Sequence, residues 1–220
     1  HDTRHRMLSW LRTKLFEQSI IDAYSRRLNQ QGTSAAGVFW ASRLSQQARF
    51  DHALMLLAAQ WHNRTTICDI GCGYGALYGF IKKTPRYQSF DYQGIDINKN
   101  MIAACKDEFG DTAPFSRARS PIWQVDVGLY IGTFNLCHAD NYILWQDYIL
   151  GQLKKSWPKC RIGIVLNITS KSNASIHNQI FYVEPVAFTA RLKQHFGPSV
   201  KVNSNPTRYV DNDTIFVISR

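Results

Sequence analysis

The sequence lacks several features that would place it in a specialised class of protein. It has no C-x-x-C pair, and its cysteines are odd in number, five in all. We therefore expect free thiols in a reducing cytoplasm, with neither a disulfide framework nor a zinc site. No apolar run is long enough to span a bilayer. No apolar stretch follows the charged start HDTRHRM, so we expect neither a signal peptide nor a membrane partner.

Long blocks of one charge are also absent, although the formal net charge is +10. Lys and Arg occur in scattered pairs such as Arg26-Arg27 and Lys82-Lys83, with no run of four and no interleaved aromatic stripe. Basic proteins favour phosphate groups, so nucleic acid stays open as a partner. An anionic small substrate fits the charge equally well, and a basic surface with neither role is the third alternative.

The first 62 residues are expected to be helical. Apolar residues recur near helical spacing from Met7 to Leu28, and Gly32 is placed to end that helix. A second helix is expected from Leu44 to Trp61. Because both helices precede a glycine-rich loop, we expect residues 1–62 to form a lid and residues 63–220 to form the core.

The core alternates between strand and helix patterns. The expected strands are residues 65–70, 92–97, 125–134 and 161–168, a weak strand near 113–118, and a closing antiparallel pair at 199–204 and 213–219. Helices are expected at residues 76–83, 98–109 and 141–157, and between Glu184-Pro185 and Gly197. Residues 169–180 are expected to be a long polar, mobile loop. This order predicts an α/β, Rossmann-like, doubly wound sheet that is mainly parallel, with ligands bound at the switch point.

The stretch CDIGCGYG, residues 68–75, is typical of a loop that binds an anionic cofactor between a strand and a helix. Gly71, Gly73 and Ala76 match the dinucleotide pattern G-x-G-x-x-A, and Asp96 stands where that pattern expects an acid. Asp69, however, would repel a pyrophosphate and suits a cationic amino group. The chain also leaves little length for the substrate domain of a dehydrogenase, which remains the minor alternative.

At these residues the sequence resembles the class I S-adenosylmethionine-dependent methyltransferases. CDIGCGYG looks like their glycine-rich first motif and GIDINKNMI like their second. The resemblance implies S-adenosylmethionine as cofactor and S-adenosylhomocysteine as product, with Asp69 on the amino group, Asp96 on the ribose, and Ile97 and Met101 near the adenine. The full set of expected cofactor residues is Asp69, Gly71, Cys72, Gly73, Asp96, Ile97, Met101, Ala118, Arg119, Gly132 and Arg49, the last on the cofactor carboxylate.

A weaker resemblance connects the chain to a bacterial subgroup of small methyltransferases. These proteins carry a Q-x-x-R-F element, here Gln46 to Phe50, and a G-x-F-N ending of the fourth strand, here Gly132 to Asn135. The third strand departs from the family pattern, because the segment SRARSP has no acid at the expected place. Ala118 and Arg119 are therefore chosen there by position alone.

The segment GTFNLCHAD after the fourth strand is where the methyl acceptor is expected. It lacks the [DN]-P-P-[YF] motif of adenine N-methyltransferases, and Cys137 lacks the proline of cytosine C5 enzymes. His138 is the candidate general base, with Asp140 to orient it. The aromatic residues expected to wall the acceptor pocket are Tyr24, Phe39, Trp40, Tyr142 and Trp145. We expect a small-molecule methyltransferase; an RNA methyltransferase and a non-catalytic binding subunit are the alternatives.

Overall fold

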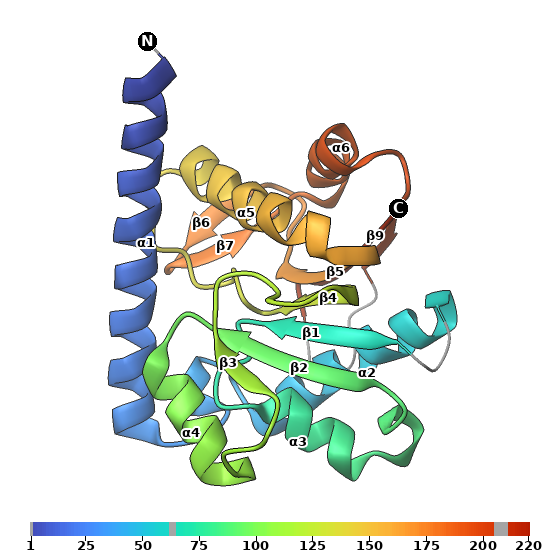
Figure 1. Cartoon of the computed structure of the whole chain (residues 1–220). Coiled ribbons are helices and arrows are strands. Elements are labelled where there is room, and N and C mark those ends of the chain that lie inside the picture. The colour runs from blue at the N-terminus through green and yellow to red at the C-terminus, as the bar shows by residue number, and fades with distance from the viewer. Residues whose placement is uncertain (1, 62–64, 205–210) are drawn as a thin grey trace.

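The computed structural model describes residues 2–61, 65–204 and 211–220, and a seven-stranded sheet forms its centre (Figure 1). The strand order is β3-β2-β1-β4-β5-β9-β8. The neighbouring strands from β3 to β5 in this order pair in parallel, and β9 lies antiparallel to both β5 and β8. The strands are β1 Thr66–Ile70, β2 Asp91–Asp96, β3 Phe115–Arg117, β4 Val125–Ile131, β5 Cys160–Thr169, β8 Val200–Asn203 and β9 Asp213–Ser219. The predicted Rossmann-like sheet is confirmed.

Helices cover both faces of this sheet (Figure 1). They are α1 Asp2–Gln31, α2 Arg43–Trp61, α3 Ala76–Lys83, α4 Lys99–Phe109, α5 Tyr142–Ser156 and α6 Pro185–Phe196. Buried side chains of α5 and α6 pack in one hydrophobic cluster, and those of α2, α3 and α4 pack in the other. The predicted start of α6 is confirmed, because the carboxylate of Glu184 accepts the backbone N–H groups of Val186 and Ala187.

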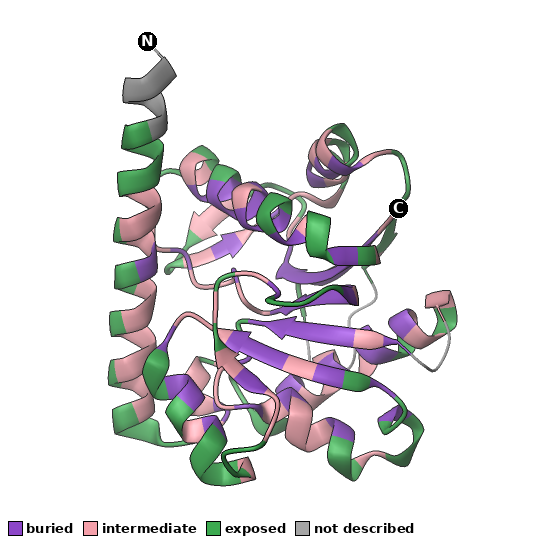
Figure 2. Cartoon of the chain, in the orientation of Figure 1, coloured by how far each residue is buried: buried purple, intermediate pink, exposed green. Residues whose placement is uncertain are grey.

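The two helices of the N-terminal segment differ in how they pack. Leu54 and Leu57 of α2 are fully buried against the sheet. Helix α1 instead runs along the carboxyl ends of the strands, and most of its length is exposed or half-buried (Figure 2). Phe16 of α1 packs edge-on against Trp145 of α5. The expected boundary between residues 62 and 63 lies outside the described residues, and the division into lid and core stays a prediction.

The prediction of one long polar loop at residues 169–180 is wrong. This segment contains the strand β6 Ser175–His177, which pairs with β7 Ile180–Tyr182 in an antiparallel hairpin. Asn178 and Gln179 at its tip have φ angles of 49° and 62°, the left-handed pair that a two-residue type I′ turn requires. The pair Asn-Gln lacks the glycine by which such turns are recognised. The hairpin is fixed by the burial of Phe181, which is a tertiary contact.

Candidate functional site

The glycine loop joins the carboxyl end of β1 to the start of α3. Gly71, Gly73 and Gly75 have φ angles of +80°, +56° and +83°, which strongly favour glycine. At Gly71 there is also no space for a side chain, because an added Cβ would lie 2.6 Å from Cγ2 of Thr133. The backbone N–H of Gly71 donates to the carbonyl of Ile95 at 2.8 Å. The loop is therefore fixed against both neighbouring strands, β2 and the end of β4.

Asp96, the last residue of β2, holds the loop from the other side. Its Oδ2 accepts the backbone N–H of Gly73 at 3.0 Å, and its Oδ1 accepts that of Asn98 at 2.8 Å. Burial raises the pKa of this carboxyl above its ordinary value, while the backbone donors act in the opposite direction. The backbone N–H of Ile97 is a further donor to this carboxylate, which keeps acceptor capacity for a ligand in the adjoining cavity.

Asp69 is the last residue but one of β1, and only 4% of its surface is exposed. The hydroxyl of Tyr92 donates to its Oδ2 at 2.8 Å. Burial, together with the nearby charge of Asp96, raises its pKa to about 7, against the lowering effect of the Tyr92 hydrogen bond. Among the described residues, no Lys, Arg or His forms an ion pair with Asp69 or Asp96.

A cavity at the switch point between β1 and β4 brings the predicted cofactor residues together. It is lined by Asp69, Gly71, Cys72, Gly73, Asp96, Ile97, Met101, Ala118, Arg119 and Gly132. Carboxylates and the glycine loop form its polar part, and Ile97, Met101 and Ala118 give it an apolar part. A cavity that is mostly apolar with a few convergent polar groups is the usual form of a small-molecule site.

Arg49 is the exception among the predicted cofactor residues, because it does not line this cavity. Its Nε lies 3.1 Å from Oδ2 of Asp213, the first residue of β9. Its guanidinium also lies over the ring of Trp40, with Cζ 4.6 Å from the ring centre. The expected contact of Arg49 with the cofactor carboxylate therefore has no support in its position; α2 points the side chain toward β9.

Polar contacts at three places along its length hold α1 across the cavity, and Asn98 and Asn100 make further bonds to Ile21 and Ser25. Arg119 donates from Nε to both carboxylate oxygens of Glu17, at 2.8 and 3.0 Å, and Glu17 is almost fully buried. Asn98, the N-cap of α4, donates from Nδ2 to the hydroxyl of Ser25 at 3.0 Å. The third contact is the pair formed by Ser19 and His138, which lie 2.9 Å apart between Oγ and Nδ1. Arg119 thus lines the cavity and also fixes the helix that covers it.

His138, the predicted general base, does not line the cavity. Its Nδ1 faces Ser19 of α1, and its Nε2 is buried with no hydrogen-bond partner among the described residues. Burial lowers the pKa of the ring below its ordinary value, so the imidazole is neutral near pH 7. The ring packs near Trp145, at 5.9 Å between centres. In this position His138 contacts α1. Its role as a base stays a prediction, and its side chain does not line the cavity.

Of the predicted aromatic wall, Tyr24 and Trp40 line the cavity. Phe39 is 41% exposed, Trp145 is fully buried, and Tyr142 stacks on Phe181 of the hairpin at 4.5 Å. Sequence reasoning missed other lining residues from α1, the 32–42 segment, β4 and α5. They include Ile20, Val38, Tyr130, Tyr148, Gln152 and, just after β4, Thr133. Only Thr133 had a local signal, because it lies in the G-x-F-N element.

All five cysteines are free and buried. In the described part of the chain, no group of three or more His, Cys, Asp or Glu side chains is placed to hold a metal ion. None of the described helices has both the length and the apolar character needed to cross a membrane.

No protein-family model matches the chain. A curated relative does: "Putative methyltransferase Rv1506c" of Mycobacterium tuberculosis is 31% identical over 139 residues, which are 61% of this chain and 82% of the relative.

Solved structures have the same fold. Magnesium protoporphyrin IX methyltransferase of Synechocystis PCC 6803, crystallised with bound S-adenosylmethionine, is 17% identical with a TM-score of 0.55, over 80% of this chain and 79% of that one. The 1,6-didemethyltoxoflavin-N1-methyltransferase of Burkholderia thailandensis was crystallised with 1,6-didemethyltoxoflavin and S-adenosylhomocysteine. It is 15% identical with a TM-score of 0.57, over 94% of this chain and 87% of that one.

Proposed function

Because the chain belongs to the class I S-adenosylmethionine-dependent methyltransferases, we propose that it transfers a methyl group from S-adenosylmethionine to a small-molecule acceptor through an O, N or S nucleophile. The observation that carries the proposal is the pair of carboxylates, Asp69 and Asp96. Both face one cavity beside the glycine loop, and neither has an ion-pair partner among the described residues. Two such carboxylates favour a ligand that carries positive charge.

The lining residues fit the cofactor group by group. The carboxylate of Asp69 binds the cationic amino group, and the free lone pairs of Asp96 accept hydrogen bonds from the ribose hydroxyls. Ile97, Met101 and Ala118 supply the apolar surface for the adenine. The loop at Gly71 and Gly73 presents backbone without a Cβ, so the ligand can approach closely.

The sulfonium of the cofactor supplies an electrophilic methyl carbon, so the chain's own residues mainly align the reactants and exclude water. Helix α1 contributes Ile20 and Tyr24 to the cavity wall. The ion pair between Arg119 and Glu17 holds this helix in place. We propose α1 and the segment that follows it as the lid, while α2, which packs on the sheet, belongs with the core.

Two features support a small acceptor over RNA. The methyltransferases named above for magnesium protoporphyrin IX and 1,6-didemethyltoxoflavin act on small molecules. The segment after β4 also lacks the base-modifying motifs. The net charge of +10 supports the RNA alternative, for which binding to RNA would weaken steeply as salt rises. The five free cysteines support a reducing, cytoplasmic location.

The test is a calorimetric titration with S-adenosylhomocysteine, and with NADH in parallel. We expect micromolar binding of the first and none of the second. Binding of NADH alone would contradict the proposal and assign the glycine loop to dinucleotides. Binding of neither ligand would favour the non-catalytic subunit.

A further inference from the structure

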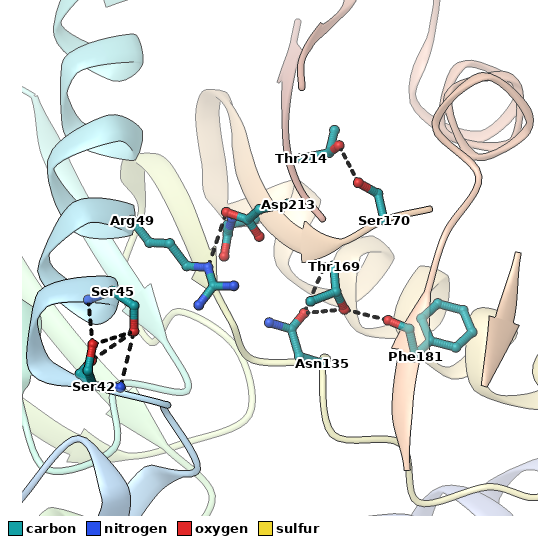
Figure 3. Close-up of polar contacts among 10 residues, drawn as sticks. Ser42, Ser45, Arg49, Asn135, Thr169, Ser170, Phe181, Asp213 and Thr214 are labelled. Carbon is teal, nitrogen blue, oxygen red and sulfur yellow. Dashed lines mark hydrogen bonds and ion pairs between the residues drawn. The ribbon is translucent and has the colours of Figure 1, made fainter. Parts of the chain in front are cut away.

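A second group of polar side chains lies beside the cavity, where β4 and β5 end and β9 begins (Figure 3). Arg49 comes from α2, Asp213 from the start of β9, and Asn135 from the segment after β4. Asp213 lies opposite Thr169 in the β5–β9 register, and Thr169 is hydrogen-bonded to Asn135. The three side chains therefore surround the same end of β5.

Trp40 links this group to the cavity. Its ring lines the cavity and covers Gly132 so closely that a Cβ there would lie 2.7 Å from the ring. The guanidinium of Arg49 lies over this ring, at 4.6 Å from its centre. Arg49 is thus one aromatic ring away from the wall of the cavity at the end of β4.

The donors of this group are only partly used. Arg49 turns its Nε toward Asp213, and its two Nη atoms have no hydrogen bond to any described residue. Oδ1 of Asn135 accepts the backbone N–H of Thr169 at 3.0 Å and its hydroxyl at 3.3 Å. These bonds fix the amide, and its Nδ2 is turned to the side of Arg49 (Figure 3). No described residue accepts a hydrogen bond from that Nδ2.

We propose that Arg49 and Asn135 bind a carboxylate of the methyl acceptor, whose body lies beside Trp40. This proposal rests on the proposed function, because it names the class of acceptor. The two Nη atoms form the planar fork that matches a carboxylate bidentately. The carboxylate of Asp213, whose Oδ2 lies 3.1 Å from Nε of Arg49, already offsets the positive charge of the guanidinium. A singly charged carboxylate therefore fits better than a dianionic phosphate.

The test uses the protein saturated with S-adenosylhomocysteine and follows the NMR signals of three probes: benzoate, its neutral analogue benzamide, and phenyl phosphate. We expect saturable binding of benzoate, at least about tenfold tighter than that of benzamide. In Asn135→Asp the bond to Thr169 is kept, but the donor becomes an acceptor, and benzoate binding is lost. Arg49→Lys keeps the ion pair with Asp213 and removes the fork, so binding weakens about tenfold.

Arg161→Gln is the matched control. It removes one surface arginine that also forms an ion pair, with Asp126, and benzoate binding is expected to stay unchanged. Equal binding of benzoate and benzamide, or benzoate binding that survives Asn135→Asp, overturns the proposal. Tighter binding of phenyl phosphate than of benzoate overturns the choice of a carboxylate.

S-adenosylhomocysteine affinity is measured first in every variant. If the wild-type protein does not bind S-adenosylhomocysteine, the proposed function is contradicted. If it binds S-adenosylhomocysteine but does not distinguish the three probes, only the acceptor site is contradicted.

Discussion

The two ends of the site are built in different ways. At the cofactor end, Asp69, the glycine loop and Asp96 come from two neighbouring strands and the turn between β1 and α3. At the proposed acceptor end, Trp40, Arg49, Asn135 and Asp213 come from four segments that are far apart in the sequence. The first end depends on a continuous motif, and the second exists only when α2, β4, β5 and β9 are assembled. Changes at the two ends should therefore affect different properties.

The largest effect is expected for Asp96→Ala. The change removes the two hydrogen bonds that hold Gly73 and Asn98, as well as the proposed ribose contact. We expect the affinity for S-adenosylhomocysteine to fall by about 100-fold, since hydrogen bonds to a charged group contribute about 1.5–3 kcal/mol each. Calorimetry measures this, with Asp91→Ala at the exposed start of the same strand as control. An unchanged affinity would falsify the ribose assignment.

Gly71→Ala should lower the free energy of unfolding. The new Cβ meets Thr133 at 2.6 Å, and the φ angle of +80° is strained for alanine. Gly110→Ala is the control, because its φ angle is +92° but nothing lies within 4 Å of the added atom. We expect Gly71→Ala to cost about 1–3 kcal/mol more than the control in urea unfolding.

Adding Thr133→Ser to Gly71→Ala sharpens this test. Serine keeps the hydroxyl that donates to the carbonyl of Ile70 but removes the methyl group that the new Cβ meets. The double variant should recover part of the lost stability. Equal losses in Gly71→Ala and Gly110→Ala would show that close packing against Thr133 contributes nothing.

The pH dependence of cofactor binding tests Asp69. Its pKa of about 7 means that the carboxyl is mostly protonated at pH 6 and mostly ionised at pH 8. A cationic amino group binds the ionised form, so the affinity for S-adenosylhomocysteine should rise about tenfold between these pH values. In Asp69→Asn the affinity should be weaker and independent of pH across this range. A wild-type affinity that does not change with pH would remove Asp69 from the amino-group site.

The smallest effect is expected for His138→Ala. The contact with Ser19 is exposed, and the ring does not line the cavity. We expect a loss of about 1 kcal/mol or less in stability, faster hydrogen exchange in α1, and an unchanged affinity for S-adenosylhomocysteine. Ser19→Ala should give the same result. If His138→Ala instead abolished turnover of an identified acceptor while Ser19→Ala did not, the residue would act as a base.

Local signals predicted most elements of the fold and many of the residues that line the cavity. The spacing of apolar residues gave the helices and strands, and Glu184, Pro185 and Gly197 marked the ends of α6. Glycines at Gly71 and Gly73 were recognised because a turn with positive φ requires that residue type. The hairpin of β6 and β7 was not predicted, because Asn178 and Gln179 adopt the left-handed conformation at its tip without a glycine.

The sequence by itself determined the alternation of strands and helices, the glycine loop and the acid at the end of β2, because each depends on residues close together in the chain. The tertiary structure alone decided that Arg49 faces Asp213 rather than the cofactor, that His138 contacts α1, and that α1 covers the cavity. A long side chain such as that of arginine can reach several partners. Which one it meets is set by the packing of helices and strands that are far apart in the sequence.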